Sequence, residues 1–156
     1  MSFTAFGPCY KAAASLLPPA MDSQAAWAML FAIGSQESRL DARRQIGGPA
    51  RGFWQFELGG IRGVLQHPAS KPLITAVLDR LDYDHFADTS YAAIADNDVL
   101  AFCYARCMLY TLPDPLPARG ETQKAWGQYI EGWRPGAPKP LTWPAFYAQA
   151  WTVAPA

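Results

Sequence analysis

Glu37 lies where a helix is expected to bury its side chains. The segment 27–40 (WAMLFAIGSQESRL) has a helical repeat of apolar residues, and Glu37 falls on the same face as Leu30 and Ile33. Burial disfavours the charged form of a carboxyl group and raises its pKa. A carboxyl group that keeps its proton near neutral pH is what general acid catalysis requires. The position of Glu37 therefore predicts a general acid. The alternative is a helix-end carboxylate paired with a nearby arginine, namely Arg39, Arg43 or Arg44.

The segment that follows this helix combines glycines with aromatic residues. Residues 47–60 read GGPARGFWQFELGG. Glycine allows a backbone to come close to itself or to a ligand. Phe53, Trp54 and Phe56 are expected to form an apolar lid, with the Gln55 amide held inside it. We therefore expect an irregular loop that carries a fixed amide toward Glu37.

These two features together resemble a known family. Glu37-Ser38, followed by Gly52-Phe53-Trp54-Gln55-Phe56, resembles the Glu-Ser … Gly-Leu-Met-Gln signature of lytic transglycosylases and goose-type lysozymes. The separation of Glu37 from Gln55 is also similar to the spacing in that family, although Trp54 stands where the family has methionine. The resemblance covers roughly a quarter of the chain. The WRPG and TWPAFYAQAW segments further resemble small lysozyme-like proteins encoded by phages and prophages.

The resemblance implies cleavage of the β-1,4 bond between N-acetylmuramic acid and N-acetylglucosamine in peptidoglycan. Glu37 would protonate the glycosidic oxygen and then act as base on the muramoyl 6-hydroxyl, giving a 1,6-anhydro product. A hydrolytic muramidase would use the same acid with water and a second carboxylate, for which Asp41 and Glu57 are the candidates. Two further alternatives are a non-catalytic virion or cell-wall-binding protein with the same fold, and a plain helical domain whose motif is coincidental.

Four residues beside Glu37 take roles from the same resemblance. Ser38 would support the glutamate or the substrate, and Gln55 would bond the catalytic carboxyl group or a substrate group. Phe53 and Trp54 would line the sugar cleft, or one of them would pack beneath Glu37 and keep it dry. The blander interpretations are a helix-end serine that bonds the backbone and an amide that clamps its own loop.

The family also has a tyrosine near its catalytic glutamate, on a late helical segment. The nearest match here is LAFCYARCMLY, residues 100–110, which lacks the family's Tyr-Asn and Gly. Tyr104 or Tyr110 would fill the role, and both are equally plausible as core residues. Arg106 on the same segment needs a partner if it is buried, and we expect a carboxylate near the cleft to provide it.

The elements that must position these residues are predicted to be mainly helices. The resemblance implies a lysozyme-like fold in one domain over residues 1–156, with a central buried helix and an irregular glycine/aromatic loop at the site. From Val99 to Tyr110 only Arg106 is charged, which is typical of a helix at the centre of a domain. Segment 43–52 is either a small hairpin or irregular backbone. The expected helices cover 9–17, a helix capped by Asp22 that carries Glu37, 59–66, 71–81, 91–95, 98–112, 121–133 and a last helix capped by Thr142.

The length, net charge and hydrophobic pattern of the chain limit the other classes of function. The chain has 156 residues and a net charge of +0, so no field favours nucleic acid, and no apolar run is long enough for membrane insertion. The N-terminus lacks the pattern of a signal peptide. We therefore expect a monomer that is made in the cytoplasm. It would reach the periplasmic cell wall after lysis, through a holin-dependent route, or as part of a virion. Cys9, Cys103 and Cys107 are expected to be reduced thiols, and no metal or other cofactor is predicted.

Overall fold

The computed structural model describes residues 3–156, which form a mainly α-helical chain with no strand among them. This confirms the predicted mainly α class. None of the helices in 3–156 has both the length and the apolar character needed to cross a membrane. The helices are α1 (Phe3–Ala14), α2 (Gln24–Ser38), α3 (Leu58–Gln66), α4 (Lys71–Arg80), α5 (Ala87–Ala93), α6 (Asp98–Tyr110), α7 (Thr122–Trp133) and α8 (Trp143–Val153).

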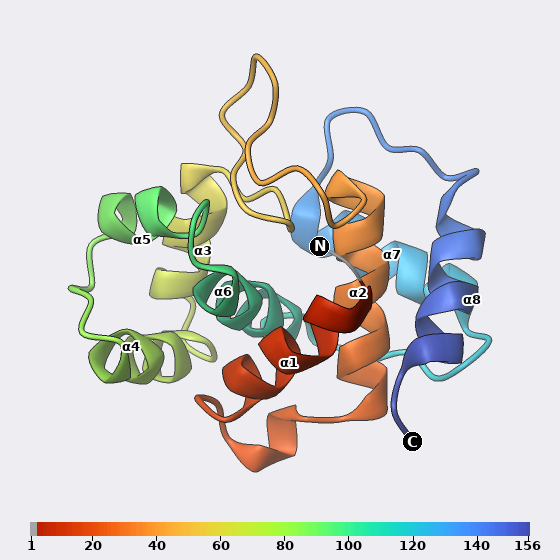
Figure 1. The fold of residues 1–156 in the computed structure, drawn as a ribbon, viewed down its shortest axis with the longest axis horizontal. Coiled ribbons are helices and arrows are strands. Elements are labelled where there is room, and N and C mark those ends of the chain that lie inside the picture. Colours follow the sequence, from red (N-terminus) through yellow and green to blue (C-terminus); the bar gives the residue numbers. More distant parts are fainter. Residues whose placement is uncertain (1–2) are drawn as a thin grey trace.

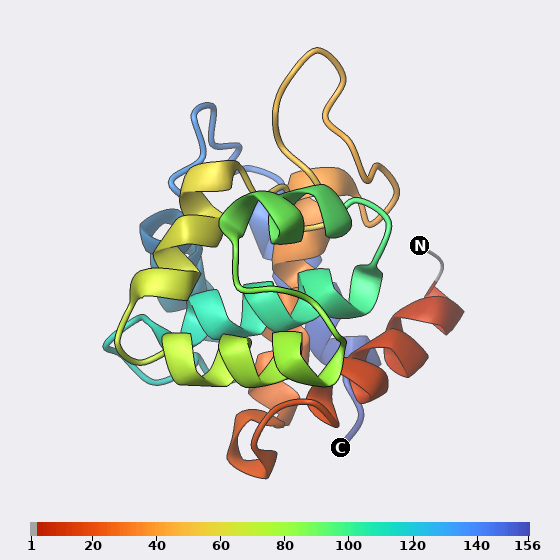
Figure 2. The same ribbon diagram turned by 90° about the vertical axis from the view of Figure 1, so that its left-hand side faces the viewer.

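Helix α6 lies at the centre of the molecule. It packs against α1, α2, α3, α4 and α7, and nearly all of its residues from Leu100 to Leu109 are buried. Figure 1 shows α3, α4 and α5 on one side of α6, with α7 and α8 on the other side, beyond α2. Figure 2 shows α6 passing between α4 and the pair α3 and α5. The Asn97 side chain caps the helix by accepting a hydrogen bond from the Leu100 N–H at 3.0 Å.

Helix α2 is the second buried helix, and it carries Glu37 in its last turn. Its residues from Ala26 to Ser35 are all buried, because α8 and α6 pack on it. Its N-cap is Ser23, which accepts a hydrogen bond from the Ala26 N–H at 3.1 Å. The prediction that Asp22 caps this helix is therefore wrong, since Asp22 instead accepts a hydrogen bond from the Tyr10 hydroxyl at 2.8 Å.

Other helix boundaries also differ from the prediction. The first helix was predicted to begin at Cys9, but α1 begins at Phe3 and contains Pro8. Phe3, Phe6 and Tyr10 have helical spacing, so the proline, which usually begins a helix, concealed the first turns. Helix α5 begins at Ala87, four residues before the predicted Tyr91, because its first turn has few apolar residues.

The loop between α2 and α3 contains a minimal piece of antiparallel structure. Two isolated bridges pair Arg44 with Arg51 and Arg51 with Phe56. Two ion pairs hold the loop to the start of α6: Arg43 with Asp98, and Arg44 with Asp96, both at 2.9 Å. The loop projects from the top of the molecule in Figure 1. The sequence left open whether segment 43–52 is a small hairpin or irregular backbone. The structure shows an irregular loop with isolated antiparallel bridges.

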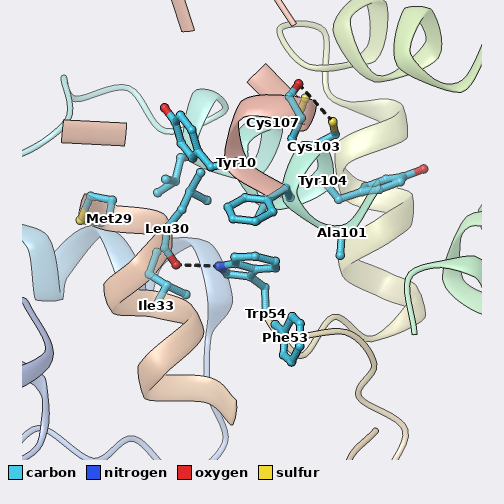
Figure 3. Close-up of a cluster of buried hydrophobic side chains, with 14 of the residues drawn as sticks. Tyr10, Met29, Leu30, Ile33, Phe53, Trp54, Ala101, Cys103, Tyr104 and Cys107 are labelled. Carbon is cyan, nitrogen blue, oxygen red and sulfur yellow. Dashed lines mark hydrogen bonds between the residues drawn. The ribbon is translucent and has the colours of Figure 1, made fainter. Parts of the chain in front are cut away.

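Trp54 fixes this loop against the buried helices (Figure 3). Its indole N–H donates to the Leu30 carbonyl at 2.8 Å, and its ring lies 4.3 Å from the Phe102 ring of α6. Gly34 makes this approach possible. A Cβ atom there would overlap the end of the Leu40 side chain and would lie 3.3 Å from the Trp54 indole nitrogen. The Trp54 side chain thus holds the loop against α2 at Leu30 and Gly34, about two turns and one turn before Glu37.

We expect the substitution Gly34→Ala to lower the free energy of unfolding by about 1–3 kcal/mol, because the added methyl group overlaps the Leu40 side chain and crowds the Trp54 indole. Denaturant unfolding followed by circular dichroism measures it. The control is Gly127→Ala in α7, where an added Cβ meets no atom within 4 Å and alanine should stabilise the helix by about 0.5–1 kcal/mol. Equal effects of the two substitutions would contradict the packing argument.

Candidate active site

A groove of about 870 Å³ runs past Glu37. On one side it is bounded by α3 and the loop before it, and on the other by the end of α7 and the segment that leads to α8. The end of α6 contributes Met108, Thr111 and Leu112 to its surface. Both Glu37 and Gln55 line the groove, so the structure brings together the two residues on which the motif depends.

The carboxyl group of Glu37 is half-buried and accepts a hydrogen bond from the Tyr129 hydroxyl at 2.6 Å through Oε1. Burial raises the pKa of Glu37, and the hydrogen bond from Tyr129 lowers it in part, with a net rise above the ordinary carboxyl value. An ionised carboxylate is destabilised by the loss of water, whereas the hydroxyl donor favours that ionised form. The pKa of Glu37 is therefore shifted in the direction that general acid catalysis near neutral pH requires.

The nearby arginines do not neutralise Glu37. Arg43 and Arg44 form their ion pairs with Asp98 and Asp96. The Arg39 guanidinium lies over the Phe146 ring, 4.9 Å from its centroid. Within residues 3–156 no cation lies within ion-pair distance of Glu37. The alternative of a helix-end carboxylate paired with arginine is therefore not what the structure shows.

Tyr129 is a site residue that the sequence analysis missed. The structure places neither expected tyrosine beside Glu37: Tyr104 is fully buried and donates to the Ser90 hydroxyl at 2.6 Å, and Tyr110 is exposed at the end of α6, outside the groove. Tyr129 lies 92 residues after Glu37 and belongs to the aromatic stripe of α7, which in sequence is indistinguishable from a core stripe. Burial and the charge of Glu37 both raise the pKa of Tyr129, so its hydroxyl keeps its proton and acts as donor.

Ser38 and Gln55 hold the site together in different ways. The Ser38 hydroxyl lies within hydrogen-bond distance of the Gly34 carbonyl at 3.1 Å and the Phe53 carbonyl at 2.7 Å, and Ser38 does not line the groove. Ser38 is therefore a helix-end serine that bonds the backbone and clamps α2 to the loop, as the blander interpretation expected. Of the two roles taken from the resemblance, a contact with the substrate does not fit this position, and support of Glu37 stays a prediction. Gln55 lines the groove, and its amide nitrogen donates to the Gly52 carbonyl at 2.9 Å, which fixes the side chain within its own turn.

Phe53 and Trp54 do not line the groove. Both side chains are fully buried, as Figure 3 shows for their packing against the core. The Arg43 guanidinium covers Phe53, 4.5 Å from its centroid. Of the two predicted placements, the lining of the sugar cleft is therefore wrong, because neither ring has an exposed face. The alternative, that one of them packs beneath Glu37, stays a prediction.

Of the two candidates for a second carboxylate, the structure places one in the groove and the other outside it. Glu57 is exposed and lines the groove at the start of α3, whereas Asp41 is exposed and lies outside it. Glu131, in the last turn of α7, also lines the groove and was not considered from the sequence. The part of the chain that the structure describes has no group of three or more His, Cys, Asp or Glu side chains arranged to hold a metal ion.

Arg106 and the cysteines lie away from the groove. The Arg106 guanidinium is buried and donates through Nε to the Met21 carbonyl at 2.9 Å, so the expected carboxylate near the cleft is replaced by a backbone oxygen. Burial lowers the pKa of Arg106. Cys103 and Cys107 are buried free thiols in α6, and burial raises the pKa of Cys107 to about 12, which makes it unreactive.

Two residues of the groove have a backbone conformation that favours glycine. Gln55 and Arg134 have left-handed φ angles of 50° and 46°, and both line the groove. Such a conformation costs a non-glycine residue on the order of 1–3 kcal/mol. Arg134 ends α7, at a position that glycine often occupies. The chain thus keeps a side chain at each position at a local cost in stability.

Helix α3, in contrast, has glycine at positions where a side chain would fit. Gly59 and Gly63 lie one turn apart and line the groove, and a Cβ atom at either would meet nothing within 4 Å. Glycine inside a helix costs about 1 kcal/mol relative to alanine, and packing does not require it here. These glycines leave a length of bare helix against which a ligand can lie closely.

Comparison of the chain with protein-family models, with curated proteins and with solved structures found no match in any of the three. The function is therefore argued from the groove itself, with the motif resemblance beside it.

Replacing Tyr129 with phenylalanine removes the hydrogen bond that favours ionised Glu37, so the pKa of Glu37 should rise further. A ¹³C NMR titration of the labelled Glu37 carboxyl group in both proteins measures the change. Tyr110→Phe, outside the groove, is the control and should leave the titration unchanged. An equal or lower pKa in Tyr129→Phe would show that the hydroxyl does not stabilise the carboxylate.

We expect Gly63→Ala to raise the free energy of unfolding by about 0.5–1 kcal/mol, because the methyl group enters open space and alanine favours the helix. Chemical denaturation of the variant beside the Gly127→Ala control checks this. A destabilised Gly63→Ala would mean that packing, not the groove, requires glycine at this position.

Proposed function

We propose that this protein cleaves the glycan strand of peptidoglycan, with Glu37 as its single acid and base and with 1,6-anhydro-muramoyl ends as products. The proposal makes it a lytic transglycosylase with a lysozyme-like fold. It is supported by the motif resemblance and by the groove. The observation that carries it is a half-buried glutamate with a raised pKa, without a cationic partner among residues 3–156, in the wall of an open groove.

In the first step, Glu37 donates its proton to the glycosidic oxygen while the bond from that oxygen to the muramoyl C1 breaks. The leaving sugar departs with a 4-hydroxyl, and C1 acquires oxocarbenium character. Glu37 is then ionised beside the Tyr129 hydroxyl. Because a hydrogen bond to a charged acceptor is stronger than one to a neutral acceptor, Tyr129 favours the proton transfer.

In the second step, the muramoyl 6-hydroxyl attacks C1 and gives its proton to Glu37. The C1–O6 bond closes the anhydro ring, and the glutamate regains the proton that it lost. This cycle uses one carboxyl group and no water. Partial burial of Glu37, which the packed loop and Tyr129 provide, helps to exclude water from the reacting carbon.

A hydrolytic muramidase is the second candidate, because two further carboxylates line the groove. Glu57 or Glu131 would act as base on a water molecule across the sugar ring. An inverting pair of carboxyl groups is separated by roughly 6.5–9.5 Å to leave room for that water. The products distinguish the two mechanisms, since the anhydro end is lighter than the hydrolysed end by one water.

We expect Glu37→Gln to lower the rate of glycan cleavage by at least about 10²-fold, because it removes the proton donor. Purified protein is added to chloroform-treated Gram-negative cells, turbidity is followed, and mass spectrometry identifies the released ends. Asp41→Asn, an exposed carboxylate outside the groove, is the matched control and should keep full activity. Anhydro ends that persist in Glu57→Gln and Glu131→Gln support the transglycosylase, and reducing ends support the muramidase.

The free energy of unfolding shows whether Glu37→Gln has lost only catalysis or has also lost its fold. The folded chain holds the Glu37 proton more tightly than the unfolded chain, so the free energy of unfolding falls as pH rises from the ordinary carboxyl pKa through the folded pKa of Glu37. Glu37→Gln removes this fall and should be at least as stable as the wild type at neutral pH. Equal loss of turbidity with wild type and Glu37→Gln would overturn the catalytic role.

A further inference from the structure

We propose that Arg134 and Lys139, on the segment between α7 and α8, bind carboxylate groups carried by the glycan strand and so select an anionic glycan over a neutral one. This inference rests on the proposed function, because it assigns a specificity to the same groove. It adds to that function the two residues that would recognise the carboxylate-bearing substituents by which peptidoglycan differs from a neutral N-acetylated glycan.

The two cations are available to a ligand. Both line the groove, and neither takes part in an ion pair within the described part of the chain. In contrast, Arg43 and Arg44 at the base of the neighbouring loop are occupied by aspartates. Arg134 and Lys139 are therefore the cations of the groove that remain open to a ligand carboxylate.

The segment that carries them is anchored to the helix of the catalytic residue. Gln36, the residue before Glu37, donates through its amide nitrogen to the Lys139 carbonyl at 2.9 Å and accepts from the Thr142 hydroxyl at 3.0 Å. At the other end, the Arg134 N–H donates to the Ile130 carbonyl at 3.0 Å in the left-handed cap of α7. The backbone at both residues therefore has a defined position relative to Glu37, and it carries the two exposed cationic side chains at the groove.

The charges of the groove are mixed. Glu57 lies just before α3, whereas Arg134 and Lys139 follow α7 and outnumber the one carboxylate near them, Glu131 in the last turn of α7. An anionic substituent is therefore attracted to the segment after α7 more than to the start of α3. The bare face of α3 at Gly59 and Gly63 leaves space on the opposite side for an uncharged sugar face.

Peptidoglycan supplies such carboxylates in two ways. Its muramic acid carries a lactyl group, which ends in a carboxylate when it is free and in a peptide stem with its own carboxylates when it is substituted. A chitin oligosaccharide has the same linkage and the same N-acetyl groups but no carboxylate. A groove that recognises the anion should therefore separate these ligands by affinity.

The experiment measures binding by calorimetry with the full-length Glu37→Gln protein, so that the ligands are not cleaved. The ligands are a peptide-bearing glycan tetrasaccharide, the same glycan stripped of peptides by an amidase, and chitotetraose. Adding Arg134→Gln should weaken carboxylate-bearing ligands about tenfold, as expected for a lost charge-assisted hydrogen bond, and change chitotetraose by less than about twofold. Lys139→Gln should add to the loss, and Arg134→Lys should restore most of the affinity.

Two variants control for structure and charge. Arg62→Gln removes an exposed arginine of α3 outside the groove and should leave all affinities unchanged. Arg134→Gly suits the left-handed cap and should fold at least as stably as the parent while losing the affinity for carboxylates. A loss confined to the peptide-bearing ligand assigns the contact to the stem carboxylates, and a loss confined to the stripped glycan assigns it to the free lactyl carboxylate. A loss for both shows that either carboxylate reaches the two cations.

Equal weakening of all three ligands by Arg134→Gln, or no weakening of any, would overturn the inference while leaving the proposed function standing. If none of the three ligands bound at all, the proposed function would fail together with the inference.

Discussion

Trp54 joins the three helices that form the base of the groove. Its indole N–H bonds the Leu30 carbonyl of α2, its ring packs on Phe102 of α6, and its own carbonyl accepts a hydrogen bond from the Trp133 indole of α7 at 2.9 Å. A single residue thus sets the distance between the helix of the acid and the helix of its hydrogen-bond partner. Because interiors are close-packed, a change in this contact moves both walls of the groove.

The acidity of Glu37 follows from where that packing stops. Helix α2 is buried on all sides through Ser35, and Glu37 comes one half-turn later, where the packing opens into the groove. The carboxyl group is therefore dry enough for its pKa to rise and open enough to meet a ligand. Tyr129 limits the rise by favouring the ionised form. Burial and one hydroxyl donor thus oppose each other at a single carboxyl group, as the proposed acid and base role of Glu37 would require.

Helical repeats in the sequence were sufficient to predict several of the helices and the burial of Glu37. The helical repeats predicted α2, α6 and α7 within a few residues of their ends, and the burial expected for Glu37 came from its place beside Leu30 and Ile33. The role of Trp54 was not predictable, since a tryptophan in a glycine-rich loop fits a ligand surface and a core equally well. Its burial depends on the close approach at Gly34, which is a tertiary contact.

Long-range contacts account for the other differences. Nothing near Glu37 in sequence indicates Tyr129, because its helix carries several aromatic residues at core spacing and only the packing of α7 selects one of them. Arg106 shows the same limit: its buried charge requires a partner, but the Met21 carbonyl that provides it lies 85 residues away. Sequence periodicity identifies which faces are buried, and the tertiary fold decides which neighbours they meet.

The span between Glu37 and Tyr129 also has a consequence for biosynthesis. The two residues lie 92 positions apart, so a ribosome-bound or truncated chain that ends before α7 contains the acid without its hydroxyl donor and without one wall of the groove. Competence of the site is therefore tied to completion of the chain and to the docking of its last helices. A chain degraded from its C-terminal end loses the site before it loses the helix that carries the acid.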